Sequence, residues 1–167
     1  MIIKSLNVGC GKDIKKSDER QKWDNLDLNK GKDIDIICNL NIYPYPVEDN
    51  TYDYIYSKNV FEHVHDAMKT LKELIRIAKK NATIEIIVPH YTNKCAYSSL
   101  DHNHYFNEIA FEEFIRYNPN LVEIIELSIV PTWFGKLLIF EWLREILIVF
   151  NMGGIYGEIN CKYKVIK

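Results

Sequence analysis

The sequence lacks the features that mark a disulfide-rich or exported protein. Its four cysteines stand far apart and include no Cys-x-x-Cys pair. The amino terminus enters an apolar segment without the charged and hydrophobic regions of a signal peptide. These absences predict free thiols and a cytoplasmic protein. The cysteines are Cys10, Cys38, Cys95 and Cys161.

Strong charge of either sign is also missing. The net charge is -2 over 167 residues, which gives no electrostatic case for a nucleic-acid partner. The lysines at 12, 15 and 16 form only a small cluster, typical of a solvated loop. Because there is no repeat, low-complexity tract or linker, residues 1–167 are expected to form a single domain.

What the sequence does contain is a glycine turn behind a short apolar strand. Leu6 and Val8 belong to the strand, and Gly9 and Gly11 follow it. Glycine has no Cβ, so the backbone can turn sharply and a ligand can approach it closely. The third glycine of a dinucleotide fingerprint is absent, since Ile14 stands there, and this disfavours a pyrophosphate ligand and a nicotinamide dehydrogenase.

An acidic residue follows the turn at a suitable distance. Leu26 and Leu28 indicate a second strand, and Asp27 lies near its end. A carboxylate at this place can accept hydrogen bonds from both hydroxyls of a ribose, as in dinucleotide sites. The two features together favour a nucleoside ligand without a pyrophosphate.

A third motif makes the pattern specific. Leu-Asn-Val-Gly-Cys-Gly, Asn25-Leu26-Asp27 and the run from Asp53 through Glu62-His63-Val64 occur in this order. Together they resemble class I S-adenosylmethionine-dependent methyltransferases, most closely the small type 11-like group. The resemblance implies an α/β, Rossmann-like fold with a mostly parallel sheet and an antiparallel last strand. The alternation of strands and helices along the chain also predicts a mainly parallel sheet, with helices on both faces.

The pattern of apolar residues fits this fold. Alternation and β-branching predict strands at 33–38, 52–57, 83–88 and 122–130, with the last strand within 155–166. Apolar spacing of three and four predicts helices at 64–80 and 108–117. Residues 12–22 are expected to hold a loop with a short helix, 42–50 a loop, and Asn81-Ala82 a turn.

The resemblance also implies a cofactor site for S-adenosylmethionine, with S-adenosylhomocysteine as the product. The glycine turn would border the methionine moiety, the acid would hold the ribose, and Asn39-Leu40 would lie beside adenine. Lys58 and Asn59 would lie beside the sulfonium. The full predicted set is Gly9, Cys10, Gly11, Asp27, Leu28, Asn39, Leu40, Lys58 and Asn59.

Histidines provide the candidates for acid–base chemistry. His63, beside Glu62 at the expected start of a helix, can titrate near neutrality, although Glu62 there would also serve as a helix cap. His102 and His104 follow the fifth strand and would share one face of an extended segment. Three roles stay open for this second group: local loop bonds, acceptor binding or catalysis, and a metal site of His90, Asp101, His102 and His104. We expect no bound metal.

Residues 133–150 form an unusually apolar segment, with a polar stripe of only Glu141, Arg144 and Glu145 if helical. The segment is too short to span a membrane, which needs about 20 apolar residues. Something must cover it. The candidates are the domain's own core, a homodimer interface, and a membrane surface or lipid-like acceptor. The contact candidates are Trp133, Phe134, Leu138, Trp142, Ile146 and Phe150.

The sequence therefore predicts a methyltransferase with a small-molecule acceptor, sugar-like or otherwise, whose identity is not encoded in any motif. The alternative is an inactive methyltransferase-like binding module. The compressed segment between the glycine turn and Asp27, and the missing acceptor motif, keep that alternative open. The expected location is the cytoplasm, with membrane-peripheral contact through 133–150 as an option.

Overall fold

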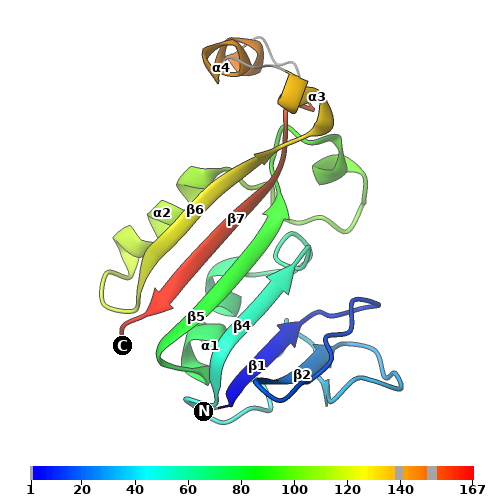
Figure 1. The fold of residues 1–167 in the computed structure, drawn as a ribbon, viewed down its shortest axis with the longest axis vertical. Helices are drawn as coiled ribbons and strands as arrows, with labels where there is room; N and C mark the ends of the chain where they lie inside the picture. The colour runs from blue at the N-terminus through cyan, green and yellow to red at the C-terminus, as the bar shows by residue number, and fades with distance from the viewer. Residues whose placement is uncertain (1, 138–140, 150–153) are drawn as a thin grey trace.

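The structure of the protein is a computed structural model that describes residues 2–137, 141–149 and 154–167. Within these residues, strands form a sheet in the order β3-β2-β1-β4-β5-β7-β6 (Figure 1). Strands β1 to β5 pair in parallel, and β7 is antiparallel to both β5 and β6. The predicted mostly parallel sheet is confirmed. Its strands span Ile3–Val8 (β1), Gln21–Asp27 (β2), Ile36–Ile37 (β3), Tyr52–Lys58 (β4), Ala78–Pro89 (β5), Val122–Pro131 (β6) and Tyr156–Val165 (β7).

The chain reverses its progress across the sheet between β3 and β4. From β1 it adds β2 and β3 on one side, and it then returns to place β4 against the other edge of β1. In open α/β sheets a crevice forms at such a switch point, outside the carboxyl ends of the strands. The segments after Val8, Asp27 and Lys58 are thereby brought to the place where a ligand is expected.

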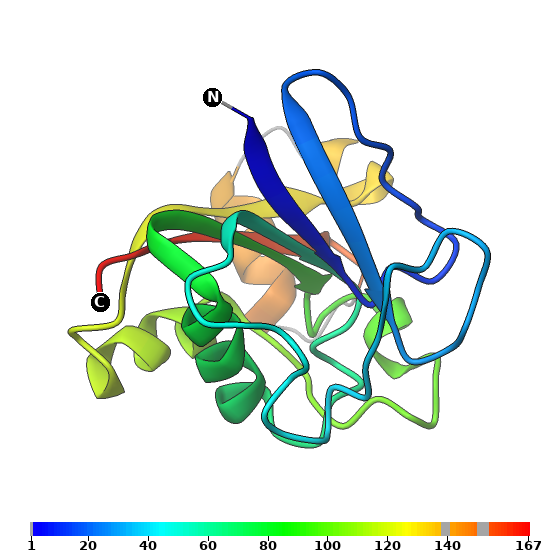
Figure 2. The same ribbon diagram turned by 90° about the horizontal axis from the view of Figure 1, so that it is seen from below.

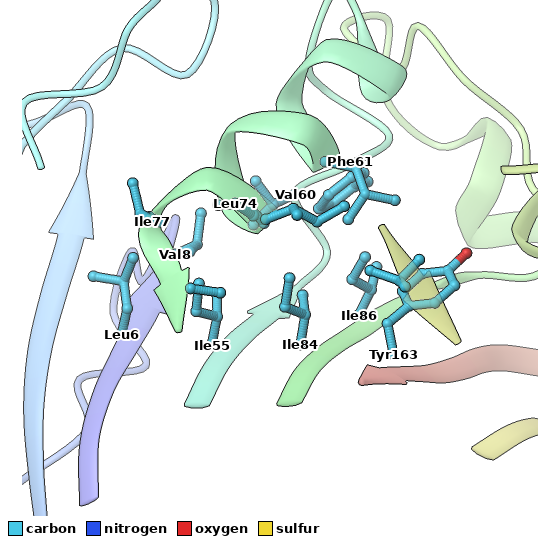
Figure 3. Close-up of a cluster of buried hydrophobic side chains, with 14 of the residues drawn as sticks. Leu6, Val8, Ile55, Val60, Phe61, Leu74, Ile77, Ile84, Ile86 and Tyr163 are labelled. Atoms are coloured by element: carbon cyan, nitrogen blue, oxygen red, sulfur yellow. The ribbon is translucent and has the colours of Figure 1, made fainter. Parts of the chain in front are cut away.

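The main core lies between the sheet and two helices, α1 (Ala67–Ile77) and α2 (Glu108–Tyr117). Figure 3 shows strand side chains pointing toward the face that carries α1, where Leu74 is fully buried. Phe114 of α2 packs on Tyr163 of β7, with ring centroids 5.9 Å apart. Each large apolar side chain buried here contributes about 1.5–3 kcal/mol, so this contact is a main source of stability.

Helix α1 is shorter than the predicted 64–80 segment. It begins after Asp66, whose Oδ1 accepts a hydrogen bond from Lys69 N at 2.8 Å. It ends at Ile77 because Ala78 is already extended and pairs with Tyr52 of β4. The turn expected at Asn81 lies inside β5 instead, where the register with β4 shifts and φ of Asn81 is 65°.

Two further segments differ from expectation. Strand β3 holds only Ile36–Ile37 of the predicted 33–38, since the Asp35 side chain accepts from Asn25 N at 2.7 Å. Residues 12–20 contain no helix. Hydrogen bonds between Asn7 and Asp13 O, and between Asn25 and the backbone of Lys15, hold this connection in a loop instead.

The expectation of helices on both faces needs a correction. Figure 2 shows α1 and α2 against the same face of the sheet. Among the described residues no helix packs on the opposite face. On that face Glu85 accepts hydrogen bonds from Tyr54 and Asn160, and Lys162 pairs with Glu126 at 2.8 Å.

Within the apolar segment 133–150 the structure describes two helices, α3 (Trp133–Leu137) and α4 (Glu141–Val149). They lie beyond one end of the sheet (Figure 1), joined by a hydrogen bond from Arg144 Nε to Gly135 O at 3.0 Å. Leu138, Phe150 and the side chain of Phe134, three of the predicted contact residues, lie outside the described residues.

The remaining contact candidates on α3 and α4 are exposed. Trp133, Trp142 and Ile146 are 77%, 61% and 42% exposed. Burial of these three side chains within the domain is therefore excluded. No helix in the described part of the chain is long and apolar enough to cross a membrane.

Candidate functional site

The glycine turn at the end of β1 has the conformation that glycine permits. Gly9 and Gly11 have φ of +60° and +49°. A Cβ on Gly9 would lie 2.5 Å from Cγ2 of Val60, whereas a Cβ on Gly11 would have no atom within 4 Å. The first glycine therefore allows close packing on the segment after β4. The second presents open backbone toward the crevice.

Two buried asparagines hold the loop that follows the turn. Asn7 Nδ2 donates to Asp13 O at 2.6 Å and to Asn25 Oδ1 at 3.1 Å. Asn25 Oδ1 also accepts from Lys15 N at 2.9 Å, and Asn25 Nδ2 donates to Lys15 O at 3.0 Å. These bonds join β1, β2 and residues 13–15, so the compressed loop has a fixed path without a helix. Both asparagines belong to the motifs that carry the resemblance, but sequence reasoning gave neither of them a role.

Asp27 lies at the end of β2, beside the turn. Its Oδ2 accepts from Gly11 N at 2.8 Å, and its Oδ1 accepts from Asn29 N at 2.9 Å. A carboxylate has about four lone-pair sites, so each oxygen can still accept from a ribose hydroxyl. The backbone bonds orient the carboxylate, and the predicted pairing of acid and glycine turn is present in the fold.

Cys10, between the two glycines, is buried. Burial raises the pKa of its thiol to about 11, and the nearby charge of Asp27 adds to the rise. The thiol is therefore protonated at neutral pH. A protonated thiol is a poor nucleophile, so this position supports a packing role beside the turn.

The residues predicted beside adenine lie after β3 and β2. Asn39 Oδ1 accepts from Asn41 N at 2.9 Å, which leaves its amide NH₂ for a ring nitrogen. Leu40 packs partly against the core. Leu28 is 59% exposed, directly after Asp27. These positions are compatible with an adenine contact, which stays a prediction.

Lys58 and Asn59 end β4 in different ways. Lys58 Nζ forms an ion pair with Glu158 Oε1 at 3.0 Å, and the hydrogen bond to Glu158 raises the pKa of the lysine. Asn59 has φ of 54° and donates its backbone N–H to Ile87 O at 2.9 Å. The lysine ammonium is thus held by β7.

A cleft of about 390 Å³ opens beside the turn. Gly11 and Asp27 form one side of it, and residues 29–34 form the other. The cleft therefore includes two members of the predicted cofactor set. The predicted residues after β3 and β4 do not line it.

The prediction that Glu62 and His63 start a helix is wrong, because both residues lie in the turn that precedes α1. The helix-cap role predicted for Glu62 is therefore wrong, and Asp66 performs it. Glu62 is only 2% exposed, and its Oε2 has no hydrogen-bond partner among the described residues. Burial raises the pKa of Glu62, although the neighbouring His63 and His102 oppose the rise.

The segment after β5 folds back onto this turn. The backbone N–H of Asn103 donates to Glu62 O at 2.6 Å, and its side chain donates to His63 O at 2.8 Å. The rings of His63 and His102 lie edge to face with centroids 4.6 Å apart. Asp101 Oδ2 lies 3.1 Å from His63 Nδ1. His63 and His102, which the sequence analysis treated separately, therefore belong to one cluster.

The other two predicted histidines have different surroundings. His104 Nε2 is buried without a hydrogen-bond partner in the part of the chain that the structure describes. His90 bonds through Nδ1 to Thr92 Oγ1 at 2.8 Å, and its Nε2 lies 3.7 Å from Glu108. The alternative metal set of His90, Asp101, His102 and His104 is thus not assembled; the structure groups His102 with Glu62 and His63 instead.

Comparison with known protein families gives a match over part of the chain. A family model described as a methyltransferase domain, of type 11, matches residues 12–86. The match includes Asp27 and the motif around Glu62. Comparison with curated proteins gives no match.

Solved structures share the fold across nearly the whole chain. A methyltransferase from Aquifex aeolicus described as S-adenosylmethionine-dependent has a TM-score of 0.60 and 18% identity, covering 99% of this chain and 82% of its own. A methyltransferase complex with an activator protein, from Haloferax volcanii, has a TM-score of 0.64 and 14% identity, covering 98% and 82%.

A third structure contains bound ligands. The phosphoethanolamine N-methyltransferase 2 of Haemonchus contortus, with phosphomonomethylethanolamine and S-adenosylhomocysteine, has a TM-score of 0.67 and 15% identity, covering 99% and 49%. Identity this low establishes the fold alone. Together with the family match, these structures confirm the predicted resemblance to class I methyltransferases of the type 11 group.

Proposed function

We propose that this chain, which carries a type 11 methyltransferase domain on a class I methyltransferase fold, transfers the methyl group of S-adenosylmethionine to a small acceptor. The observation that carries the proposal is the contact between Asp27 and Gly11 N at the switch point of the sheet. It supports the proposal because a carboxylate that could accept from ribose hydroxyls lies beside a backbone that a ligand can approach. The chain would act as one domain.

The predicted cofactor residues surround this contact from several elements. Asp27 would hold the ribose, and Asn39 and Leu40 would lie against adenine. The turn of Gly9 to Gly11 would border the methionine moiety. Methyl transfer needs alignment and exclusion of water more than strong acid or base groups, so few further residues are required.

The acceptor would lie at the carboxyl end of β4 and β5. There His63 and His102 form their cluster, and His104 follows on the same segment. If the acceptor is a hydroxyl, one of these imidazoles would take its proton as the bond to carbon forms. The described site offers no observation that favours the alternative of an inactive binding module.

Calorimetry with S-adenosylhomocysteine, S-adenosylmethionine and NAD tests the cofactor assignment. We expect micromolar binding of the first two and none of NAD. Asp27→Asn should weaken S-adenosylhomocysteine by about 2 kcal/mol, or roughly 30-fold, because bonds to a charged acceptor contribute about 1.5–3 kcal/mol. Glu19→Gln, an equal charge change on the exposed loop, should leave the affinity unaltered. Absence of binding to the wild-type protein at saturating ligand would exclude the enzyme assignment.

We also propose that α3 and α4 provide the contact surface of a homodimer. Trp133 on α3 and Trp142 on α4 are exposed, and these two helices lie at one end of the molecule (Figure 1). Closed dimers use one patch twice. Contact of α3 and α4 with a membrane surface, from a cytoplasmic location, is the second option, and vesicle co-sedimentation distinguishes the two.

A further inference from the structure

The turn after β4 and the segment after β5 bring together three side chains that can ligate a metal. One ligand atom from each of Glu62, His63 and His102 lies within 4.8 Å of the others. The first two are neighbours in sequence, whereas His102 arrives from the far side of α1 and β5. The bonds from Asn103 to Glu62 O and His63 O fix this arrangement, so the cluster is built by the fold.

Glu62 brings to this cluster a buried carboxylate oxygen without a hydrogen-bond partner from the described part of the chain. Its side chain is 98% buried, yet Oε2 has no hydrogen-bond partner within the described residues. A buried polar atom without a partner is unfavourable, and more so when it carries charge. A cation between Glu62 and the two imidazoles would supply the missing interaction. It would also favour the charged form of a carboxylate that burial otherwise opposes.

The surroundings of the histidines are those of metal ligands. Nδ1 of His102 donates to the carbonyl oxygen of Ala96 at 2.6 Å, since a carbonyl can only accept. The neutral ring then carries its lone pair on Nε2. Asp101 adds a carboxylate 3.1 Å from His63 Nδ1. Outer carbonyl and carboxylate partners of this kind orient the ligating imidazoles in known sites.

We propose that Glu62, His63 and His102 bind one divalent transition-metal ion, with Zn²⁺ as the best-fitting ion. Two imidazoles and a carboxylate form a known catalytic zinc set, which leaves a coordination position open. Ligands at 2.0–2.1 Å around a tetrahedral ion lie about 3.4 Å apart, so modest side-chain rotations close the cluster. The sequence analysis considered a different set of ligands, His90, Asp101, His102 and His104, and expected no bound metal there.

An ion at this position gives the site a Lewis acid at the acceptor end. Its open position would take an oxygen of the acceptor and lower the pKa of a hydroxyl there. This role rests on the proposed methyl transfer, whereas the metal site itself does not. The experiment must therefore measure metal binding without turnover.

Zn²⁺ alone is the probe, added to chelator-treated full-length protein in a competition titration with a chromophoric chelator. We expect one Zn²⁺ per chain and a higher melting temperature of the wild-type protein on binding. Glu62→Gln and His102→Gln should each lose this binding and the thermal shift. Asp101→Asn should weaken the affinity about 10–100-fold, as outer-shell changes do. His65→Gln is the matched control, because His65 is an exposed histidine in the same turn, and it should bind as the wild type does.

Two results overturn the proposal: no stoichiometric Zn²⁺ in the wild-type protein, or equal affinity in Glu62→Gln, His102→Gln and the control. If Glu62→Gln or His102→Gln unfolds, His63→Gln takes its place in the experiment. The side chain of His63 is 38% exposed, so this position tolerates exchange more readily. S-adenosylhomocysteine titrations on the same metal-free proteins keep the two proposals apart. Zinc binding without S-adenosylhomocysteine binding supports the metal site and overturns the methyltransferase assignment. S-adenosylhomocysteine binding without zinc binding supports the methyltransferase assignment and overturns the metal site.

Discussion

Replacing each glycine of the turn by alanine should separate its packing role from its binding role. Both residues have positive φ, but only the Cβ added at Gly9 would meet a neighbour, Val60 Cγ2 at 2.5 Å. The Cβ added at Gly11 would enter open space at the crevice. We therefore expect Gly9→Ala to destabilise the fold and Gly11→Ala to weaken the ligand.

The magnitudes follow from two separate penalties. A left-handed conformation costs a residue with a Cβ about 1–2 kcal/mol, and both variants incur it. Overpacking against a buried side chain costs about 1–3 kcal/mol more, and only Gly9→Ala incurs that. The lower entropy of the unfolded alanine chain offsets about 0.4–1 kcal/mol. The expected losses are about 3 kcal/mol for Gly9→Ala and about 1 kcal/mol or less for Gly11→Ala, by these terms.

Thermal and urea unfolding measure the stabilities, and calorimetry measures S-adenosylhomocysteine binding. Gly9→Ala should lower the melting temperature by about 6–12 °C, since each kcal/mol shifts it by about 2–4 °C at this size. Gly9→Ala should be milder in a Val60→Ala background, with a coupling of at least about 1 kcal/mol, as contacting residues show. Equal losses from the two glycines, or no coupling to Val60, would refute the derived geometry of the turn.

Two other predictions concern α3–α4 and the buried thiol. Replacing both Trp133 and Trp142 by glutamate should turn a dimer into a folded monomer in sedimentation experiments, because both side chains are exposed in one chain; a wild-type monomer would exclude this interface. Burial raises the pKa of Cys10 from 9.0 to about 11, so its contribution to stability is complete below pH 9 and is lost as the pH rises toward 11. Cys10→Ser should lessen that alkaline loss in urea unfolding, and identical pH profiles of the two proteins would contradict it.

The sequence predicted those parts of the site that depend on local chemistry. A glycine turn behind an apolar strand, and an acid at the end of the next strand, are each determined within a few residues. Their contact then follows from parallel pairing, because adjacent carboxyl ends meet at one edge of the sheet. The bond from Gly11 N to Asp27 Oδ2 is therefore the most predictable feature of the site.

The parts that the sequence missed depend on contacts between distant residues. Asn7 and Asn25 occupy strand positions where a polar side chain ordinarily indicates solvent, yet they bond to each other in the interior. Helix α1 ends at Ile77 because strand pairing captures Ala78, and helical periodicity contains no information about that competition. The cluster of His63 with His102 likewise requires the path of the chain after β5.

The sheet face that no described helix covers shows where the order of elements along the chain misled. Helices on both faces were expected because strands and helices alternate in sequence, whereas β5 and β7 alternate strictly between buried and half-exposed positions near Glu85 and Lys162. Such alternation indicates a sheet with one face toward water. The ion pairs on that face, including Lys58 with Glu158, are half-exposed, and pairs of this kind contribute about 0–1 kcal/mol each. Their main effect is to make a bare sheet face compatible with water, so the fold needs no second helical layer and the stability of the domain rests on the α1 and α2 side.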